Sequence, residues 1–170
     1  MPIHVFRYKS VQGRLAPLIT VGLKLQETWY PIATYVDAYT GYGMPLVEFP
    51  YTLRKEYVML IIPITIVAHK IWAFVDSGAF YTLLRVDEAH RLGIDWTSGR
   101  RQRIVVGDGS FIPTYIHDLS IHIGPWEVTA PVGFSERLGI GFNVLGRTGI
   151  FDQFQVCFND RTRRVTFQKL

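Results

Sequence analysis

The sequence of 170 residues predicts an all-β protein with one or two short helices. Most of the chain consists of short runs rich in β-branched and aromatic residues, which favour strands. Glycine, proline, aspartate or asparagine separates most of these runs, as is usual for turns between short strands. Many short strands with few helices are typical of a closed or sandwiched all-β fold.

The strands are predicted where an apolar or alternating run ends at a turn signal. The longest apolar run, 57–68, is too short for a membrane span and contains Pro63, and its β-branched residues favour a buried strand. A helix is predicted for Val86–Leu92, because Gly93 is placed as its left-handed terminator, and a second one near 148–153. The predicted strands are 18–25, 32–36, 58–67, 71–75, 103–106, 111–115, 119–123, 128–134, 154–158 and 165–168.

The composition predicts one globular domain, because 48% of the residues are hydrophobic and 19% are charged. The net charge is +4 and the pI about 9.3. Two arginine clusters, 100–103 and 161–164, are interpreted as solvated turns and not as a nucleic-acid surface, which needs a basic face with base-reading elements. The single Cys157 lies in an apolar run and is expected to be a buried small hydrophobe.

Other functional classes find little support. The N-terminus lacks the apolar core of a signal peptide, so a soluble, cytoplasmic protein without membrane contact is expected. The five histidines form no cluster with metal-ligand spacing, and no phosphate-binding Gly-Lys-Ser/Thr loop occurs. We therefore expect neither a metal nor a cofactor.

The position of one aspartate in the sequence is not explained by the needs of folding alone. Asp76 lies between two apolar strand-like runs, 71–75 and 81–84. Burying a carboxylate costs several kcal/mol unless something compensates. Ser77 and Gly78 follow Asp76 and favour a tight loop that presents the carboxylate.

Two later segments accompany this loop. Apolar residues flank a Gly-Asp-Gly turn in 103–113, which is a hairpin signal. Segment 142–147 contains the apolar pair Val144-Leu145 followed by Gly146 and Arg147. In order, the three segments resemble the catalytic loop, the flap and the hydrophobic-hydrophobic-Gly element of retropepsin-like (retroviral-type) aspartic proteases, of the bacterial single-lobe type.

The resemblance covers 58–170 and implies a closed acid-protease-type β-barrel lobe. It implies an aspartic endopeptidase in which catalytic Asp76 pairs with its counterpart in a homodimer, since one chain holds one motif. Two carboxylates about 3 Å apart share one proton, so one activates water and the other protonates the scissile carbonyl of a peptide or protein substrate.

The resemblance also implies roles for the neighbouring residues. Ser77 would hydrogen-bond across the dimer, Gly78 would allow close backbone approach to the carboxylates, and Ala79 would line the cleft. Leu145, Gly146 and Arg147 would lie behind the site. The flap would consist of Val106, Gly107, Asp108, Gly109 and Ser110, and apolar subsites of Phe80, Tyr81, Val106 and Phe111.

The chain departs from the family pattern after the catalytic loop. Retroviral members often have acidic residues there, one of which pairs with the arginine after the later glycine. Phe80 and Tyr81 occupy these positions here, so Arg147 needs another partner or water.

The N-terminal part holds a possible partial repeat, because 6–37 echoes 49–76 from an aromatic pair to Val-Asp. Asp37 is given no catalytic role, since its glycine comes too late to form the same loop. Residues 1–48 are predicted to be a β-rich extension or prosegment, and 49–170 the protease domain. Two alternatives stay open: a non-catalytic peptide-binding or dimerisation module whose cleft this extension blocks, and a basic RNA-binding β-barrel.

Overall fold

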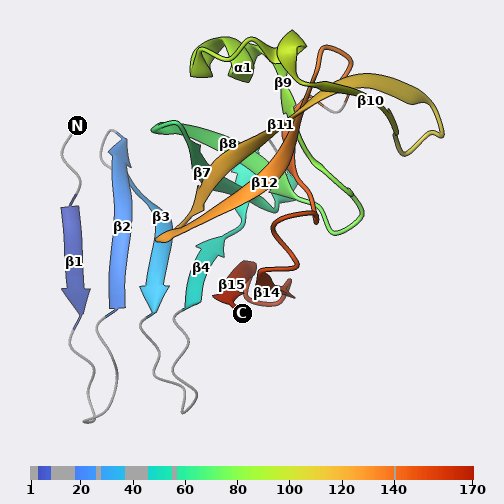
Figure 1. The fold of residues 1–170 in the computed structure, drawn as a ribbon. Coiled ribbons are helices and arrows are strands. Elements are labelled where there is room, and N and C mark those ends of the chain that lie inside the picture. The colour runs from blue at the N-terminus through green and yellow to red at the C-terminus, as the bar shows by residue number, and fades with distance from the viewer. Residues whose placement is uncertain (1–3, 9–17, 26–27, 37–45, 55–56, 140) are drawn as a thin grey trace. The chain divides into compact units, whose positions relative to one another are not determined.

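The computed structural model describes residues 4–8, 18–25, 28–36, 46–54, 57–139 and 141–170 (Figure 1). Most of these residues are in strands, which confirms the all-β prediction. The chain divides into two compact units, the first formed by Met1–Leu60 with Gln153–Leu170 and the second by Ile61–Asp152. Within the described ranges, no helix is long and apolar enough to cross a membrane.

The first unit is built on an antiparallel sheet of six strands in the order β1-β2-β3-β4-β15-β14. The C-terminal strands join the N-terminal ones directly, since Val165 of β15 pairs with Phe49 of β4. A short separate hairpin, β5 (Thr52–Arg54) with β6 (Tyr57–Met59), follows. The strands of the sheet are β1 (His4–Tyr8), β2 (Leu18–Leu25), β3 (Thr28–Val36), β4 (Leu46–Pro50), β14 (Phe154–Asn159) and β15 (Arg164–Lys169).

Three phenylalanines form the aromatic centre of this unit. Phe167 makes edge-to-face contacts with both Phe49 and Phe154, each with ring centroids 5.9 Å apart. All three rings are almost fully buried, and such pairs add to the free energy of area burial. An ion pair of 2.6 Å between Arg164 and Glu48 also connects β15 with β4.

The second unit is a seven-stranded sheet in the order β10-β11-β12-β9-β13-β8-β7. Strand β11 also pairs with β7 through His122 and Thr65, so the sheet closes on itself. This closure agrees with the expected barrel-like lobe. Its strands are β7 (Ile61–Ile66), β8 (His69–Val75), β9 (Thr82–Arg85), β10 (Arg100–Val105), β11 (Phe111–Ile123), β12 (Trp126–Ser135) and β13 (Asn143–Leu145).

The helix α1 (Val86–Leu92) has the predicted bounds. Gly93 ends it with a left-handed φ of 69°, and its N–H donates to the carbonyl of His90. Ala89 and Leu92 are buried, while Asp87 lies in the first turn, where the helix dipole favours a negative charge. A 3₁₀ turn, η1 (Trp96–Ser98), follows before β10.

The second predicted helix is wrong. Residues 148–153 form turns, with the N–H groups of Ile150 and Phe151 both donating to the carbonyl of Arg147. The segment Thr148-Gly149-Ile150 has few helix formers, and Gly149 has a φ of 78°, which a helix does not allow. The two predicted strands 111–115 and 119–123 are one continuous strand, β11.

Cys157 is exposed on β14, so the prediction that it is buried is also wrong. This strand is the last of its sheet and has a largely exposed burial pattern, which an apolar run does not reveal. The arginine cluster 100–103 lies on strand β10 and not in a turn. Arg161 and Arg163 are exposed in the β14–β15 turn, as predicted.

Some parts of the sequence prediction fall outside this description. Asp37 and the junction 41–45 lie outside the described residues. The roles proposed for 1–48 stay predictions, although three strands and the start of β4 within that segment belong to the same sheet as β14 and β15.

Candidate active site

Asp76 follows the last residue of β8 and opens a tight loop to β9. Its N–H donates to the carbonyl of Leu145 at 3.1 Å, and its carbonyl accepts from Ala79 N–H at 3.2 Å. Carboxylate oxygen Oδ1 accepts from Gly78 N–H at 2.8 Å. The loop therefore fixes the backbone of Asp76 while leaving its side chain half-exposed.

Gly78 leaves more room for this arrangement than any other residue would. A Cβ at this position would lie 3.2 Å from Oδ1 of Asp76, which is tighter than most real contacts. The glycine thus leaves room for its N–H to approach the carboxylate of Asp76.

The segment after β13 lies directly against the loop. Arg147 N–H donates to the carbonyl of Ala79 at 3.0 Å, and Thr148 N–H to that of Phe80 at 2.9 Å. A Cβ on Gly146 would lie 2.2 Å from the Tyr81 carbonyl oxygen, so only glycine fits between the two chain segments. The structure therefore brings Leu145, Gly146 and Arg147 together with the Asp76 loop.

Strand β13 holds this segment in place between two other strands. It runs parallel to β8, with Leu145 opposite Val75, and its Val144 pairs with Leu83 of β9. The N–H of Gly146 donates to the hydroxyl of Thr82, which is fully buried. Both strands that flank the Asp76 loop are thus tied to the same short element.

Asn143 is a structural residue that the sequence analysis missed. It is 5% exposed, and its Oδ1 accepts from Arg85 N–H at 3.0 Å. Its Nδ2 donates to the Trp72 carbonyl at 3.1 Å and to Glu88 at 3.0 Å. An asparagine directly before the apolar pair Val144-Leu145 was the available signal, because a buried amide needs several partners.

The Gly-Asp-Gly segment forms the predicted hairpin between β10 and β11, with Val105 opposite Phe111. Gly109 has a φ of 80° and donates to the carbonyl of Val106 at 2.8 Å, which closes the turn. Oδ1 of Asp108 accepts from Ser110 N–H at 2.9 Å. Hydrogen bonds from Ser110 hold the pKa of Asp108 below its usual range. Gly107 does not have a positive φ.

The hairpin and the Asp76 loop share one apolar cluster. Its buried centre includes Leu83 and Ile112, and Ala79 of the loop and Val106 of the hairpin pack against it half-buried. Of the predicted subsite residues, Tyr81 and Val106 belong to the cluster. Phe80 and Phe111 are 63% and 52% exposed. The other members are Leu138, Val144, Ile104 and Phe142.

Two predicted site residues present free polar side chains. Ser77 is exposed, and no hydrogen bond of its hydroxyl is found within the described part of the chain. Arg147 is exposed, and its guanidinium has no carboxylate partner among the described residues. The sequence expectation that Arg147 lacks the usual acidic neighbour therefore agrees with the structure.

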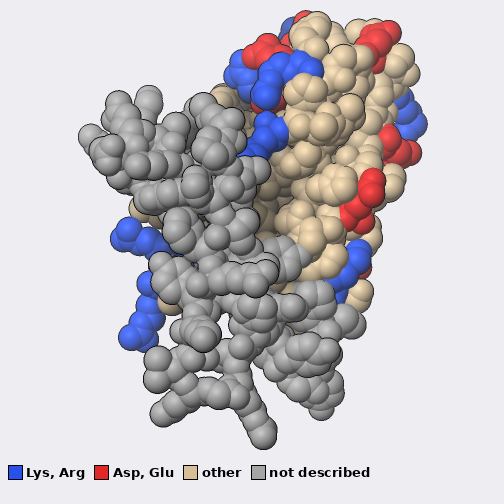
Figure 2. Space-filling model, turned by 90° about the vertical axis from the view of Figure 1, so that its left-hand side faces the viewer, with Lys and Arg blue, Asp and Glu red and all other residues tan. Residues whose placement is uncertain are grey.

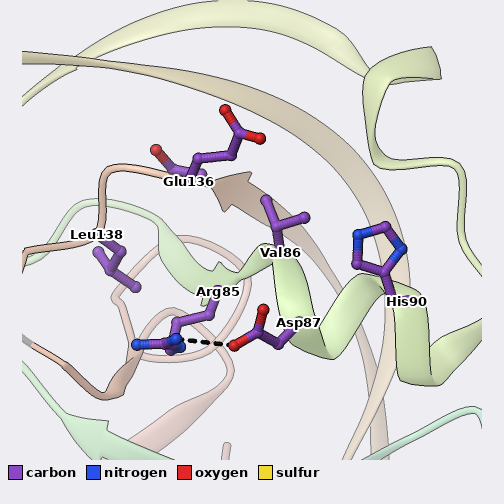
Figure 3. Close-up of a pocket in the computed structure, with 7 residues that line it drawn as sticks. Arg85, Val86, Asp87, His90, Glu136 and Leu138 are labelled. Atoms are coloured by element: carbon purple, nitrogen blue, oxygen red, sulfur yellow. Dashed lines mark hydrogen bonds and ion pairs between the residues drawn. The ribbon is translucent and has the colours of Figure 1, made fainter.

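A separate polar pocket of about 290 Å³ lies where β9 passes into α1 (Figure 3). None of its lining residues belongs to the Asp76 loop or to the turn 106–110. Arg85 pairs with Asp87 at 2.7 Å across it and holds the pKa of Asp87 below its usual range. No three His, Cys, Asp or Glu residues of the described chain are placed to hold a metal ion. The lining residues are Arg85, Val86, Asp87, His90, Ser135, Glu136 and Leu138.

Charged side chains of both signs occur on the face of the molecule drawn in Figure 2, and basic ones alone lie at its left-hand edge. On its described part, charges of both signs lie near one another along the upper and right-hand edges, with mostly uncharged side chains between them. Arg103 stacks on the Phe111 ring, with 4.4 Å from its guanidinium carbon to the ring centroid. Along the upper and right-hand edges, the described charges are therefore mixed and not uniformly basic.

Comparison with known proteins identifies the family of the chain. A protein-family model described as aspartyl protease matches residues 62–147. A search of curated proteins gives no significant match.

Several solved structures are similar. A retropepsin-like aspartic protease from Rickettsia conorii has a TM-score of 0.56 at 16% identity, over 74% of this chain and 94% of that one. The retroviral protease-like domain of Ddi1 from Leishmania major has a TM-score of 0.48 at 22% identity, over 67% and 95%. EIAV protease in complex with the inhibitor HBY-793 has a TM-score of 0.44 at 17% identity, over 56% and 88%.

The region matched by the family model contains the Asp76 loop, the glycine hairpin and the Leu145-Gly146 element. The Rickettsia structure supports the fold of this region independently. The chain therefore belongs to the aspartyl protease family, and its fold is similar to that of a retropepsin-like aspartic protease.

Proposed function

We propose that the chain is an aspartic endopeptidase that acts as a homodimer, with Asp76 of each protomer forming the catalytic pair. The observation that supports this most directly is the state of the Asp76 side chain. Its backbone is anchored by Leu145 and Ala79, while Gly78 N–H is the one hydrogen-bond donor that contacts its carboxylate among the described residues. A carboxylate held in this way remains available for chemistry.

The reaction follows from two such carboxylates on a two-fold axis. Like charges about 3 Å apart do not both ionise easily, so the two carboxylates can share one proton. The ionised member takes a proton from water, which attacks the scissile carbonyl, and the protonated member donates to the carbonyl oxygen. The titration belongs to the pair and not to either residue.

The neighbouring elements suit supporting roles. The free hydroxyl of Ser77 supports a hydrogen bond to the partner protomer. The hairpin β10–β11 is proposed as a flap that closes over an extended peptide and excludes water. The cluster that joins Ala79 to Val106 would then form an apolar wall beside the scissile bond.

Cleavage of a peptide library by the wild type and by Asp76→Asn tests the proposal, from about pH 4 to about pH 7. Asp118→Asn is a matched control, because it makes the same chemical change at an exposed carboxylate of the same unit. Cleavage by a dimeric wild type and by the control, but not by Asp76→Asn, is expected. Equal cleavage by wild type and Asp76→Asn would contradict the dyad.

The mass in solution is measured in parallel. A folded monomer without cleavage would favour the non-catalytic alternative, in which residues 1–48 block the cleft or prevent pairing.

A further inference from the structure

Arg147 combines a fixed main chain with an unpaired side chain. Its N–H is bound to the carbonyl of Ala79, and the next residue is bound to Phe80, so its Cα cannot move away from the Asp76 loop. The residue is exposed, and no hydrogen bond or ion pair of its guanidinium occurs among the described residues. The main chain of Arg147 is thus anchored beside the proposed catalytic loop, and its cationic side chain is left without a partner among the described residues.

Two other arginines of this unit are paired with acids. Arg85 pairs with Asp87 at 2.7 Å, and Arg91 with Glu88 at 2.6 Å. Residues 61–152 contain seven arginines and one lysine against nine carboxylates, so the free state of Arg147 does not come from a shortage of acids. An arginine fork binds a carboxylate through two parallel hydrogen bonds, which makes it selective for acids.

Phe80 adds an apolar surface to the same pair of segments. Its ring is 63% exposed and stands edge-on to Tyr81, with centroids 4.8 Å apart. A single exposed ring needs no special explanation. The segment that contains Phe80 is, however, hydrogen-bonded to the segment that contains Arg147. The Phe80 ring can therefore contact the methylene groups of an acidic side chain that binds Arg147.

The chain limits how far Arg147 can lie from Asp76. Leu145 is bound to Asp76, and Arg147 is two residues further, which spans at most about 7 Å. An extended peptide advances about 3.3 Å per residue. With the length of its own side chain, Arg147 reaches substrate residues about two to four positions from the scissile bond.

We propose that Arg147 is a specificity-determining residue that binds a substrate carboxylate, so that preferred substrates have Asp or Glu about two to four residues from the scissile bond. The inference rests on the proposed function. In a homodimer each protomer supplies one Arg147, so equivalent acidic positions are selected on both sides of the bond.

Peptide binding to the Asp76→Asn protein tests this without requiring cleavage. Labelled peptides with an apolar centre are made in pairs, which differ in having Glu or Gln at one position about two to four residues from the scissile bond. The dissociation constants of each pair are compared by fluorescence anisotropy. The Glu peptide is expected to bind about three- to tenfold more tightly at one or more positions, as for a partly exposed charge pair. Adding Arg147→Gln should abolish the difference, and Arg147→Glu should reverse it.

Arg161→Gln is the matched control, since it removes the same charge from an exposed turn of the other unit. It should leave the Glu preference unchanged. Equal affinity for Glu and Gln peptides, binding of neither, or equal weakening of both by Arg147→Gln would overturn the proposal. A shift to monomer in Arg147→Gln with the preference retained would also overturn it, because Arg147 would then pair with the second protomer.

Cleavage by the wild type is scored separately. If the wild type does not cleave but Asp76→Asn still selects Glu through Arg147, the proposed function fails and the acid-binding subsite stands.

Discussion

The N–H of Gly146 donates a hydrogen bond to the buried hydroxyl of Thr82 at 3.1 Å. This bond joins the turn after β13 to the first residue of β9, just beyond the Asp76 loop. Because the hydroxyl is inaccessible to water, no solvent molecule can replace it when the side chain is changed.

Thr82→Val is therefore expected to lower the free energy of unfolding by about 1–3 kcal/mol, since it leaves the Gly146 N–H buried without an acceptor. Thr82→Ser keeps the hydroxyl and should cost about 1 kcal/mol for the lost methyl group. Urea unfolding measures both. A valine variant as stable as the wild type would show that the hydrogen bond contributes nothing.

Gly146→Ala should be more damaging than the loss of that bond. Its Cβ would lie 2.2 Å from the backbone oxygen of Tyr81, and backbone atoms cannot rotate away as a side chain can. We expect a loss of about 3 kcal/mol or failure to fold. Gly139→Ala is the control, because a Cβ there meets nothing within 4 Å. Similar melting temperatures for both variants would disprove the steric argument.

Gly78→Ala is expected to affect activity more than stability. The added Cβ would press on Oδ1 of Asp76 at 3.2 Å, which a small shift of the carboxylate can relieve. If the proposed function is right, such a displacement lowers kcat by about tenfold or more, because catalysis depends on precise placement of the pair. Unchanged kcat in a folded variant would argue against close approach of this backbone to the reacting groups.

Thr114→Val should stabilise the protein. The hydroxyl of Thr114 is buried and has no hydrogen-bond partner within the described residues. Valine has nearly the same shape and removes the desolvation cost, so the free energy of unfolding should rise by about 1 kcal/mol. Thr114→Ile should instead destabilise, because the existing methyl group already packs against Gly133. A lower melting temperature for the valine variant would reveal a partner for the hydroxyl.

The Tyr51–Asp160 hydrogen bond of 2.8 Å should make stability depend on pH in the alkaline range. Desolvation, with the bond to the Asp160 carboxylate, raises the pKa of Tyr51 from 10.0 to about 12. A raised pKa means that the stabilisation is complete below pH 10.0 and is lost as the pH rises through about 12.

Wild type is compared with Tyr51→Phe by denaturant unfolding over this range. The wild type should be the more stable protein at lower pH, and the difference should vanish near the top of the range. A difference that does not change with pH would contradict the assignment.

The sequence by itself determined the elements whose signals are local. Helix α1 and its glycine terminator, the Gly-Asp-Gly hairpin and the Asp76 loop each depend on residues adjacent in the chain, where backbone preference decides. The family resemblance rested on the same short segments and was confirmed by the family match.

Only the tertiary structure decided which segments meet. Strands β9 and β13 have four and three residues, too few for a periodic pattern, and they exist because β8 and β12 pair with them. Buried Asn143 and Thr82 acquired their roles from partners distant in sequence. Exposure of Cys157 followed from its place on an edge strand. Hydrogen-bond partners and burial depend on the whole sheet, so no local pattern encodes them.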